Sequence, residues 1–257
     1  DCSEILDDPR FHITNYFKGI KEFFWMFYRA QHTLEIFALP FYQKFFASHV
    51  KYLVSLAQNE TLQVRTNINT MESFSKYWVE NSIKNLHEIS QSFDLSHIQN
   101  KFSGIPTAVV GAGPSLDPSL DFIAKHQDDL LIIAVDTAVK ALKAKNITPH
   151  IVCILEWNEL SWRTLADAGI SDSVLLFTET SNTNVCKIPA RSKISVFQNN
   201  IAPSNHFSRM LNKISVVTCG TVSSLAFNTA IISGGNPIFL FGQDLSFTKD
   251  SKYSEFT

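Results

Sequence analysis

The fold is decided by one stretch of sequence, Val109-Val110-Gly111-Ala112-Gly113-Pro114-Ser115-Leu116-Asp117-Pro118, in which an apolar strand runs into a glycine-rich turn. Gly111 and Gly113 can adopt backbone angles closed to other residues, so an anion can approach the main chain there. Asp117 as the N-cap and Pro118 at the first helical position predict a helix that starts directly after the turn. Free N–H groups at that start and the Ser115 hydroxyl favour a bound phosphate.

The same turn has a plainer interpretation. Gly-x-Gly also occurs as a tight connection between a strand and a helix that binds nothing. The turn alone therefore leaves both a phosphate site and a structural connection open.

Five further apolar runs follow, and each ends in polar residues. They are Leu130–Val135 before Asp136, His150–Leu155 before Glu156, Val174–Phe177 before Thr178 and Glu179, Ile194–Phe197 before Gln198, and Pro237–Phe241 before Gly242-Gln243-Asp244. Helical segments such as Thr137–Lys145 and Thr221–Ser233 lie between them. The alternation predicts an α/β fold, a Rossmann-like and mostly parallel sheet with helices on both faces.

The polar residues at the strand ends are the candidate site. In such sheets ligands bind beyond the carboxyl ends of the strands, near the switch point in strand order, so these side chains are expected to converge on one crevice. Loops are polar in any case, so each residue taken singly is equally well explained as an ordinary loop residue. The series of strand ends favours the crevice.

Two common nucleotide signatures fit poorly. A dinucleotide fingerprint requires a third glycine where Leu116 stands, although Asp136 lies about where a ribose-binding acid belongs. A mononucleotide P-loop requires Gly-Lys-Ser/Thr after the turn, and the sequence has no such triplet there. Both NAD and P-loop chemistry are disfavoured.

Three ordered motifs resemble those of a known family, the motility accessory factors, bacterial proteins that glycosylate flagellin with nonulosonic acids such as pseudaminic or legionaminic acid. The motifs are Gly111-Ala112-Gly113-Pro114-Ser115-Leu116-Asp117, Thr218-Cys219-Gly220-Thr221-Val222 and Gly242-Gln243-Asp244-Leu245-Ser246-Phe247-Thr248. The first two are also similar to motifs of bacterial sialyltransferases that use CMP-sialic acid. The resemblance covers about Pro106 to Thr248. It implies a cytoplasmic glycosyltransferase that moves a CMP-activated nonulosonic acid to a serine or threonine of flagellin or another protein.

The resemblance also assigns roles to residues. Gly111, Gly113, Pro114 and Ser115 would hold the phosphate of the CMP-sugar, Asp136 and Glu156 would lie near its ribose or base, Thr218, Gly220 and Thr221 near the sugar carboxylate, and Gln243 and Asp244 at the reacting centre. Asp244 and Glu156 are the candidate catalytic carboxylates. The sialyltransferases use a histidine as general base, and no histidine here, His206 included, lies in a motif that carries this role. A magnesium site at Asp136, Glu156 and Asp244 stays open beside plain hydrogen bonding to hydroxyls.

Two rival functions remain. A related archaeal branch of this superfamily transfers diphosphate from ATP to a hydroxymethylpterin, so the same turn would also suit a kinase. The second rival is a non-catalytic protein that binds a nucleotide or flagellin, which the aromatic helices and the lack of an identified base favour.

Composition excludes several classes of protein. The 257 residues carry 22 basic and 24 acidic side chains, and a net charge of -2 gives no electrostatic case for a nucleic-acid binder. The four cysteines are scattered without C-x-x-C spacing, which predicts free thiols in a reducing, cytoplasmic compartment. No apolar run reaches the length of a membrane span. The chain starts at Asp1 without a methionine and stops soon after the last motif, as expected of a piece of a longer protein with its C-terminus truncated.

Residues 1–103 differ from the rest of the chain in their sequence pattern, because they contain long helical patterns and many aromatic residues. They are predicted to form an N-terminal helical region. Gln99–Gly104 is the expected connection to a nucleotide-sugar-binding domain at 104–257. Aromatics cluster at 23–28 and again at Phe41, Tyr42, Phe45 and Phe46. Core packing of helices is the favoured explanation, with a membrane-surface helix or a docking face as the alternative.

Overall fold

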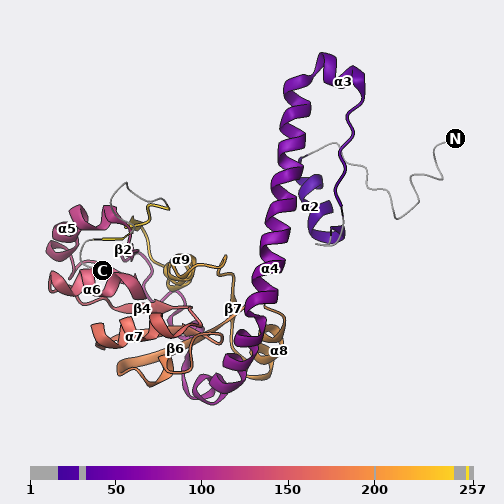
Figure 1. Ribbon diagram of the computed structural model, residues 1–257. Coiled ribbons are helices and arrows are strands. Elements are labelled where there is room, and N and C mark those ends of the chain that lie inside the picture. The colour runs from indigo at the N-terminus through magenta and orange to yellow at the C-terminus, as the bar shows by residue number, and fades with distance from the viewer. Residues whose placement is uncertain (1–16, 29–32, 200, 246–252, 255–257) are drawn as a thin grey trace. The chain divides into compact units, whose positions relative to one another are not determined.

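The computed structural model describes residues 17–28, 33–199, 201–245 and 253–254 (Figure 1). The chain divides into two compact units, Asp1–Lys76 and Tyr77–Thr257. In the described residues, no helix is long and apolar enough to cross a membrane.

The first unit is helical. It contains α2 (Phe17–Phe27), α3 (Pro40–Phe45) and the part of α4 (Ala47–Gln91) that precedes Tyr77. Phe24 and Tyr28 are buried at 3% and 5% exposure, and the Arg65 Nε donates to the Tyr28 hydroxyl at 3.0 Å. Lys21 forms an ion pair with the buried Glu60 at 3.3 Å, so α2 is attached to α4 by both apolar and polar contacts.

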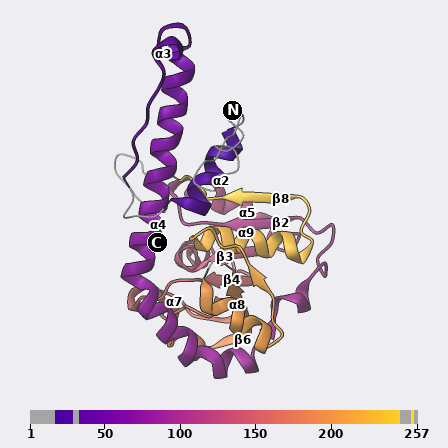
Figure 2. The ribbon, with the colours of Figure 1, turned by 90° about the vertical axis from the view of Figure 1, so that its right-hand side faces the viewer.

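The second unit is built on a parallel sheet. Its strands are β1 (Phe93–Asp94), β2 (Thr107–Val110), β3 (Leu131–Val135), β4 (Ile151–Ile154), β5 (Ile170–Thr178), β6 (Ala190–Gln198), β7 (Ser215–Val216) and β8 (Ile238–Phe241). They lie in the order β1-β6-β5-β4-β3-β2-β8, with β7 beside β6, and every pair is parallel. Figure 2 shows β8, β2, β3, β4 and β6 in this sequence.

Helices cover both faces of the sheet. The α-helices are α5 (Leu120–Lys125), α6 (Val139–Ala144), α7 (Glu159–Ala168), α8 (Ala202–Met210) and α9 (Val222–Ser233), and the 3-10 turns are η1 (Leu95–Ile98), η2 (Pro114–Ser119), η3 (Asp136–Ala138) and η4 (Val185–Lys187). In Figure 1, α5, α6 and α7 lie on one side of the sheet and α8 and α9 on the other.

The strands have apolar sequences because both faces of the sheet are buried. All residues of β2, β3 and β4 are buried. Each buried Val, Leu or Ile side chain stabilises the fold by about 1.5–3 kcal/mol relative to an exposed one. The predicted α/β class, with a mostly parallel sheet and helices on both faces, is confirmed.

The switch in strand order lies between β2 and β8. The chain runs outward from β2 through β3, β4, β5 and β6, and then returns to place β8 on the opposite side of β2. A parallel sheet opens a crevice at the carboxyl ends of the strands at such a point. The predicted Gly111 turn and the Gly242 loop are the two segments that leave the sheet there.

The predicted helix start at Asp117 is wrong. The turn leads into the 3-10 helix η2, which begins at Pro114 with Gly113 as its N-cap, so Asp117 lies inside it. Proline is favoured at the first helical position, and the chain offers it twice, at Pro114 and Pro118. Gly113 N–H, directly before Pro114, donates to Gly242 O at 2.9 Å.

The boundary between the compact units also differs from the one expected at 103/104. It falls at 76/77, within α4, because the last turns of this helix belong to the sheet unit. Asn85 Nδ2 donates to Glu179 O and Ser181 O at 2.9 and 2.8 Å, and β1 pairs with β6. The sheet unit therefore includes the stretch 77–103.

Candidate functional site

A cavity of about 570 Å³ opens at the carboxyl ends of β2, β3, β4 and β8. Its lining comprises Ala112, Gly113, Val135, Asp136, Thr137, Glu156, Asn158, Ser161, Val222, Ser223, Gly242, Gln243, Asp244, Leu245 and Tyr253. The volume suits a small-molecule ligand, and the position is the one that strand order predicts. The ends of β2, β3, β4 and β8 therefore converge on one crevice, whereas the polar residues that end β5 and β6, which were expected there too, are absent from its lining.

Gly111 and Gly113 lie where the turn after β2 packs closely against the loop after β8, which leaves no room for a side chain. A Cβ at Gly111 would lie 2.6 Å from Gly242 O and 2.7 Å from Gln243 Nε2. A Cβ at Gly113 would lie 1.9 Å from Asp244 Oδ2 and 2.8 Å from Gly242 O. All four distances are shorter than non-bonded atoms allow. The close backbone approach that the sequence assigned to an anion is thus made by the segment after β8.

Asp244 holds the turn from the opposite loop. Its Oδ2 accepts hydrogen bonds from the Ser115 backbone N–H at 3.2 Å and from the Ser115 hydroxyl at 2.9 Å. The two donors expected to hold a phosphate therefore bind the carboxylate of Asp244. Through these two hydrogen bonds Asp244 acts as a cap of the turn.

Asp136 and Glu156 form a pair of carboxyl groups at neighbouring strand ends. Burial raises the pKa of Asp136 to about 7, the Thr137 N–H offsets part of this rise, and the nearby Glu156 carboxylate adds to it. Burial also raises the pKa of Glu156. Since the pair lines the cavity, a ligand can reach two carboxyl groups that keep their protons to a higher pH than usual.

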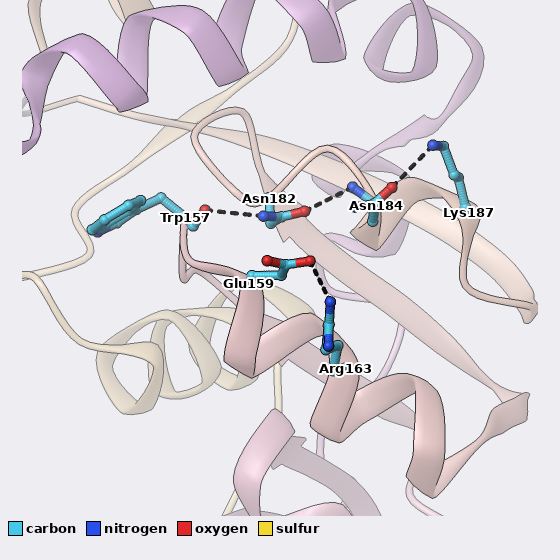
Figure 3. Close-up of polar contacts among 6 residues, drawn as sticks. All are labelled: Trp157, Glu159, Arg163, Asn182, Asn184 and Lys187. Atoms are coloured by element: carbon cyan, nitrogen blue, oxygen red, sulfur yellow. Dashed lines mark hydrogen bonds and ion pairs between the residues drawn. The ribbon is translucent and has the colours of Figure 1, made fainter.

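The loop that carries Glu156 is fixed by neighbouring segments. Figure 3 shows Asn182 Nδ2 donating to Trp157 O at 3.3 Å, with Asn182 Oδ1 accepting from Asn184 N at 3.0 Å. Asn182 N donates to Glu156 O at 3.0 Å, and the indole of Trp157 stacks on Tyr77 at 4.6 Å. A loop held at both its backbone and its side chain presents Glu156 at a defined position.

Asn158 connects this loop to a helix. Its Oδ1 accepts from Ser161 N at 3.1 Å and caps α7, while its Nδ2 donates to Glu156 Oε2 at 3.3 Å. Both Asn158 and Ser161 line the cavity. The Asn-x-x-Ser spacing is a helix-start signal, and it could have identified these two residues from the sequence.

The motif Thr218-Cys219-Gly220-Thr221-Val222 leads into the start of α9. Thr221 is the N-cap, and its Oγ1 accepts from Ser224 N at 3.2 Å. The next two residues, Val222 and Ser223, line the cavity, whereas Thr218, Gly220 and Thr221 do not. Thr218 is fully buried and donates to Gln198 Oε1 at 2.8 Å.

Thr218 belongs to a buried polar network at the ends of β5 and β6. Gln198 Nε2 donates to Thr180 Oγ1 at 2.7 Å, and the Glu179 carboxylate accepts from Gln198 N and the Ser204 hydroxyl. Glu179 is fully buried, and this burial raises its pKa to about 7. The polar residues that end β5 and β6 thus face one another in the interior rather than the cavity.

The predicted site residues separate into two groups. Those that line the cavity are Gly113, Asp136, Glu156, Gln243 and Asp244, and those that do not are Gly111, Pro114, Ser115, Thr218, Gly220 and Thr221. His206, on α8, is exposed and absent from the lining. Gln243 Nε2 is buried against the Gly111 turn and has no hydrogen-bond partner among the described residues.

Metal binding was left open by the sequence. Among residues 17–28, 33–199, 201–245 and 253–254, no group of three or more His, Cys, Asp or Glu side chains lies close enough to hold an ion. Asp136, Glu156 and Asp244 therefore do not form a three-ligand site.

Comparison with models of protein families shows to which family the chain belongs. The family model described as 6-hydroxymethylpterin diphosphokinase MptE-like matches residues 80–250, well over half of the 257 residues. The chain belongs to the MptE-like family. The match begins inside α4 and ends beyond β8, so it spans the sheet and all the cavity residues except Tyr253.

Two relatives are proteins of Treponema pallidum (strain Nichols), both described as uncharacterized. One is 26% identical over 125 residues, which cover 48% of this chain and 58% of the relative. The other is 28% identical over 141 residues, which cover 54% of this chain and 24% of the relative. The chain thus spans only part of the length of the relatives it matches.

A solved structure has the same fold. The MAf glycosyltransferase from Magnetospirillum magneticum AMB-1 matches with a TM-score of 0.61 and 24% identity, over 76% of this chain and 32% of that one. The resemblance drawn from the three motifs is therefore confirmed, by the family model for the MptE-like branch and by the fold for the MAf protein.

Proposed function

We propose that this chain forms the donor-binding part of a glycosyltransferase that moves a CMP-activated nonulosonic acid to a serine or threonine hydroxyl of flagellin or a similar protein. The observation that carries the proposal is the cavity at the sheet's switch point, where Asp136 and Glu156 meet Gln243 and Asp244. The likeness of the fold to a MAf glycosyltransferase supports it.

The charge of the cavity supports this class of donor. Its lining includes three carboxyl groups and, among the described residues, no lysine or arginine. A lining without a basic side chain disfavours a triphosphate relative to a CMP-sugar, which carries one phosphodiester and one carboxylate. Carboxylates and amides bind the hydroxyl groups of ribose and sugar well.

The carboxyl pair supports the chemistry. In the proposed step, the acceptor oxygen attacks the anomeric carbon, the bond from that carbon to the phosphate oxygen breaks, and CMP leaves with the electron pair. Glu156, which lines the cavity, accepts the proton of the acceptor hydroxyl. Asp136, whose pKa burial raises to about 7, lies beside it in the lining.

The family description favours a second candidate, diphosphate transfer from ATP to a hydroxymethylpterin. The two functions differ in donor. Incubation with flagellin and a CMP-nonulosonic acid is expected to add the mass of the sugar to flagellin, as measured by intact-protein mass spectrometry. Formation of AMP and a pterin diphosphate from ATP and hydroxymethylpterin would instead establish the kinase, and binding of flagellin without either product would establish a non-catalytic protein.

The pH dependence of transfer tests the roles of the pair. Since Glu156 acts only when deprotonated and burial raises its pKa, turnover is expected to rise with pH as this carboxyl loses its proton and then to level off. Asp136→Asn removes one negative charge and is expected to move this inflection to lower pH, because the remaining carboxyl loses its proton more easily beside a neutral neighbour. Glu156→Gln is expected to lower turnover at least a hundredfold. An unchanged profile in Asp136→Asn would remove the pair from the mechanism.

A further inference from the structure

The hairpin between α2 and α4 exposes a dense group of large apolar side chains. This aromatic tip consists of Phe37, Leu39, Phe41, Tyr42, Phe45 and Phe46, and their exposed fractions range from 49% at Phe46 to 87% at Phe37. No residue of α3 is buried. Isolated exposed apolar residues are ordinary, but six within ten positions form a contiguous patch of the kind that marks an interaction surface.

Local packing shows that the tip is not a part of the helical core. Phe41 contacts Phe45 and Phe46 with ring centroids at 4.9 and 6.2 Å, and Tyr42 contacts Phe46 at 6.0 Å. The rings therefore pack on one another and keep an exposed face. In contrast, Phe24 of α2 is 3% exposed. The prediction that the aromatics pack into a core holds for Phe24 and is wrong for the tip.

Charge around the tip indicates what kind of surface it contacts. From Ile36 to Asn59 the sequence has two lysines, Lys44 and Lys51, and no aspartate or glutamate. Lys44 is the basic residue in the last turn of α3, and its Nζ lies 5.4 Å from the centroid of the Phe45 ring. Glu35, directly before this segment, is also exposed, so the tip combines apolar rings with a small net positive charge, which complements an anionic partner.

A second copy of the chain fits this surface poorly. Two such tips placed face to face would bring Lys44 and Lys51 of one copy near the same lysines of the other, and like charges at an interface are unfavourable. Aromatic rings with lysines at their edge match the boundary of a lipid bilayer, where rings lie at the depth of the headgroups and lysines reach lipid phosphates.

We propose that the aromatic tip binds the surface of an anionic lipid bilayer as a peripheral contact. The rings of Phe41, Phe45 and their neighbours enter the headgroup region, and Lys44 and Lys51 pair with anionic lipid. The segment from Pro40 to Phe45 is a short helix and does not cross the bilayer. The contact holds the acceptor-modifying chemistry proposed above at a membrane surface but does not depend on it, since it rests on the helical unit alone.

Vesicle flotation of the unmodified chain tests the proposal. The chain is expected to float with vesicles of phosphatidylcholine and 30% phosphatidylglycerol and to bind pure phosphatidylcholine at least tenfold more weakly. Phe41→Ser combined with Phe45→Ser is expected to lower the partition coefficient at least tenfold. The matched control is Leu62→Gln with Met71→Gln, because these residues of α4 are 64% and 49% exposed and lie outside the tip.

A second variant keeps the test valid if the aromatic substitutions disturb folding. Lys44→Glu with Lys51→Glu leaves every ring in place and is expected to abolish the preference for anionic vesicles, with an unchanged circular dichroism spectrum. The proposal is overturned if the unmodified chain does not float with anionic vesicles, or if the control pair loses as much binding as the tip pair. It is also overturned if light scattering shows a dimer that only the tip variants dissociate, since a second copy then covers the rings.

Discussion

At the scale of single residues, the carboxylate of Asp244 occupies the donor groups of the Gly111 turn that were expected to bind a phosphate. Its Oδ2 accepts from both donor groups of Ser115, so the carboxylate acts first as a positioning group. Asp244→Asn keeps an oxygen that can accept both hydrogen bonds, and we expect turnover within about tenfold of the parent and a small change in melting temperature. Asp244→Ala removes the acceptor and is expected to weaken binding of the CMP-sugar. Calorimetry and steady-state kinetics measure both. A loss of a hundredfold or more in Asp244→Asn at unchanged stability would instead make Asp244 a catalytic carboxylate.

Gly113 gives a second prediction at this scale. Since a Cβ there would lie 1.9 Å from Asp244 Oδ2, Gly113→Ala is expected to push the two loops apart and to cost about 1–3 kcal/mol of unfolding free energy, with loss of CMP binding. Gly220→Ala is the control, because a Cβ at Gly220 has nothing within 4 Å and meets only the strain of its φ of +74°. Urea unfolding of both variants makes the comparison. Retained CMP binding in Gly113→Ala would show that the loops move apart freely.

At the scale of elements, the ends of β5 and β6 are predicted to make stability depend on pH. Glu179 is fully buried there, and its pKa is about 7 in the folded chain against an ordinary value of 4.5. The folded state therefore holds this proton more tightly than the unfolded state, so stability falls as pH rises from about 4.5 to 7. A shift of this size corresponds to about 3 kcal/mol.

Glu179→Gln tests this dependence. The amide stays neutral at every pH, so the difference in unfolding free energy between pH 5 and pH 8 is expected to be smaller than in the parent. It does not vanish, because the variant still contains Asp136. Glu159→Gln is the control, since Glu159 is exposed on α7 and pairs with Arg163. A pH profile of Glu179→Gln that matched that of Glu159→Gln would contradict a role for the buried carboxyl.

The elements also show what the sequence could and could not predict. The buried strands are apolar throughout because helices cover both sides, and this made the sheet and the cavity's location predictable. The directions of the strand-end side chains were not, because their partners are distant in sequence. Gln198 and Thr218 bond to each other across 20 residues, and Asn85 reaches the Glu179 backbone across 94. No local pattern distinguishes such inward residues from Asp136 and Glu156, which do line the cavity.

At the scale of the whole molecule, the division at 76/77 predicts which part is needed for donor binding. Every residue of the cavity lining lies in Tyr77–Thr257. A chain that begins at Tyr77 is expected to fold and to bind CMP within about threefold of the parent affinity. A chain that begins at Gly104 loses β1 and the hydrogen bonds of Asn85, and is expected to melt at a clearly lower temperature. Differential scanning fluorimetry and calorimetry test both. Equal stability of the two shortened chains would place the boundary at 103/104, as the sequence suggested.

The central claim is that the cavity at the switch point binds the donor of a glycosyl transfer. Isothermal titration calorimetry of CMP and of ATP with magnesium measures this binding, on the parent chain and on Glu156→Ala combined with Asp136→Ala, which removes the groups that would bind the ribose hydroxyls. CMP is expected to bind the parent more tightly than ATP does, and the double variant is expected to bind CMP at least tenfold more weakly. Tighter binding of ATP, or CMP binding that the double variant retains in full, would contradict it.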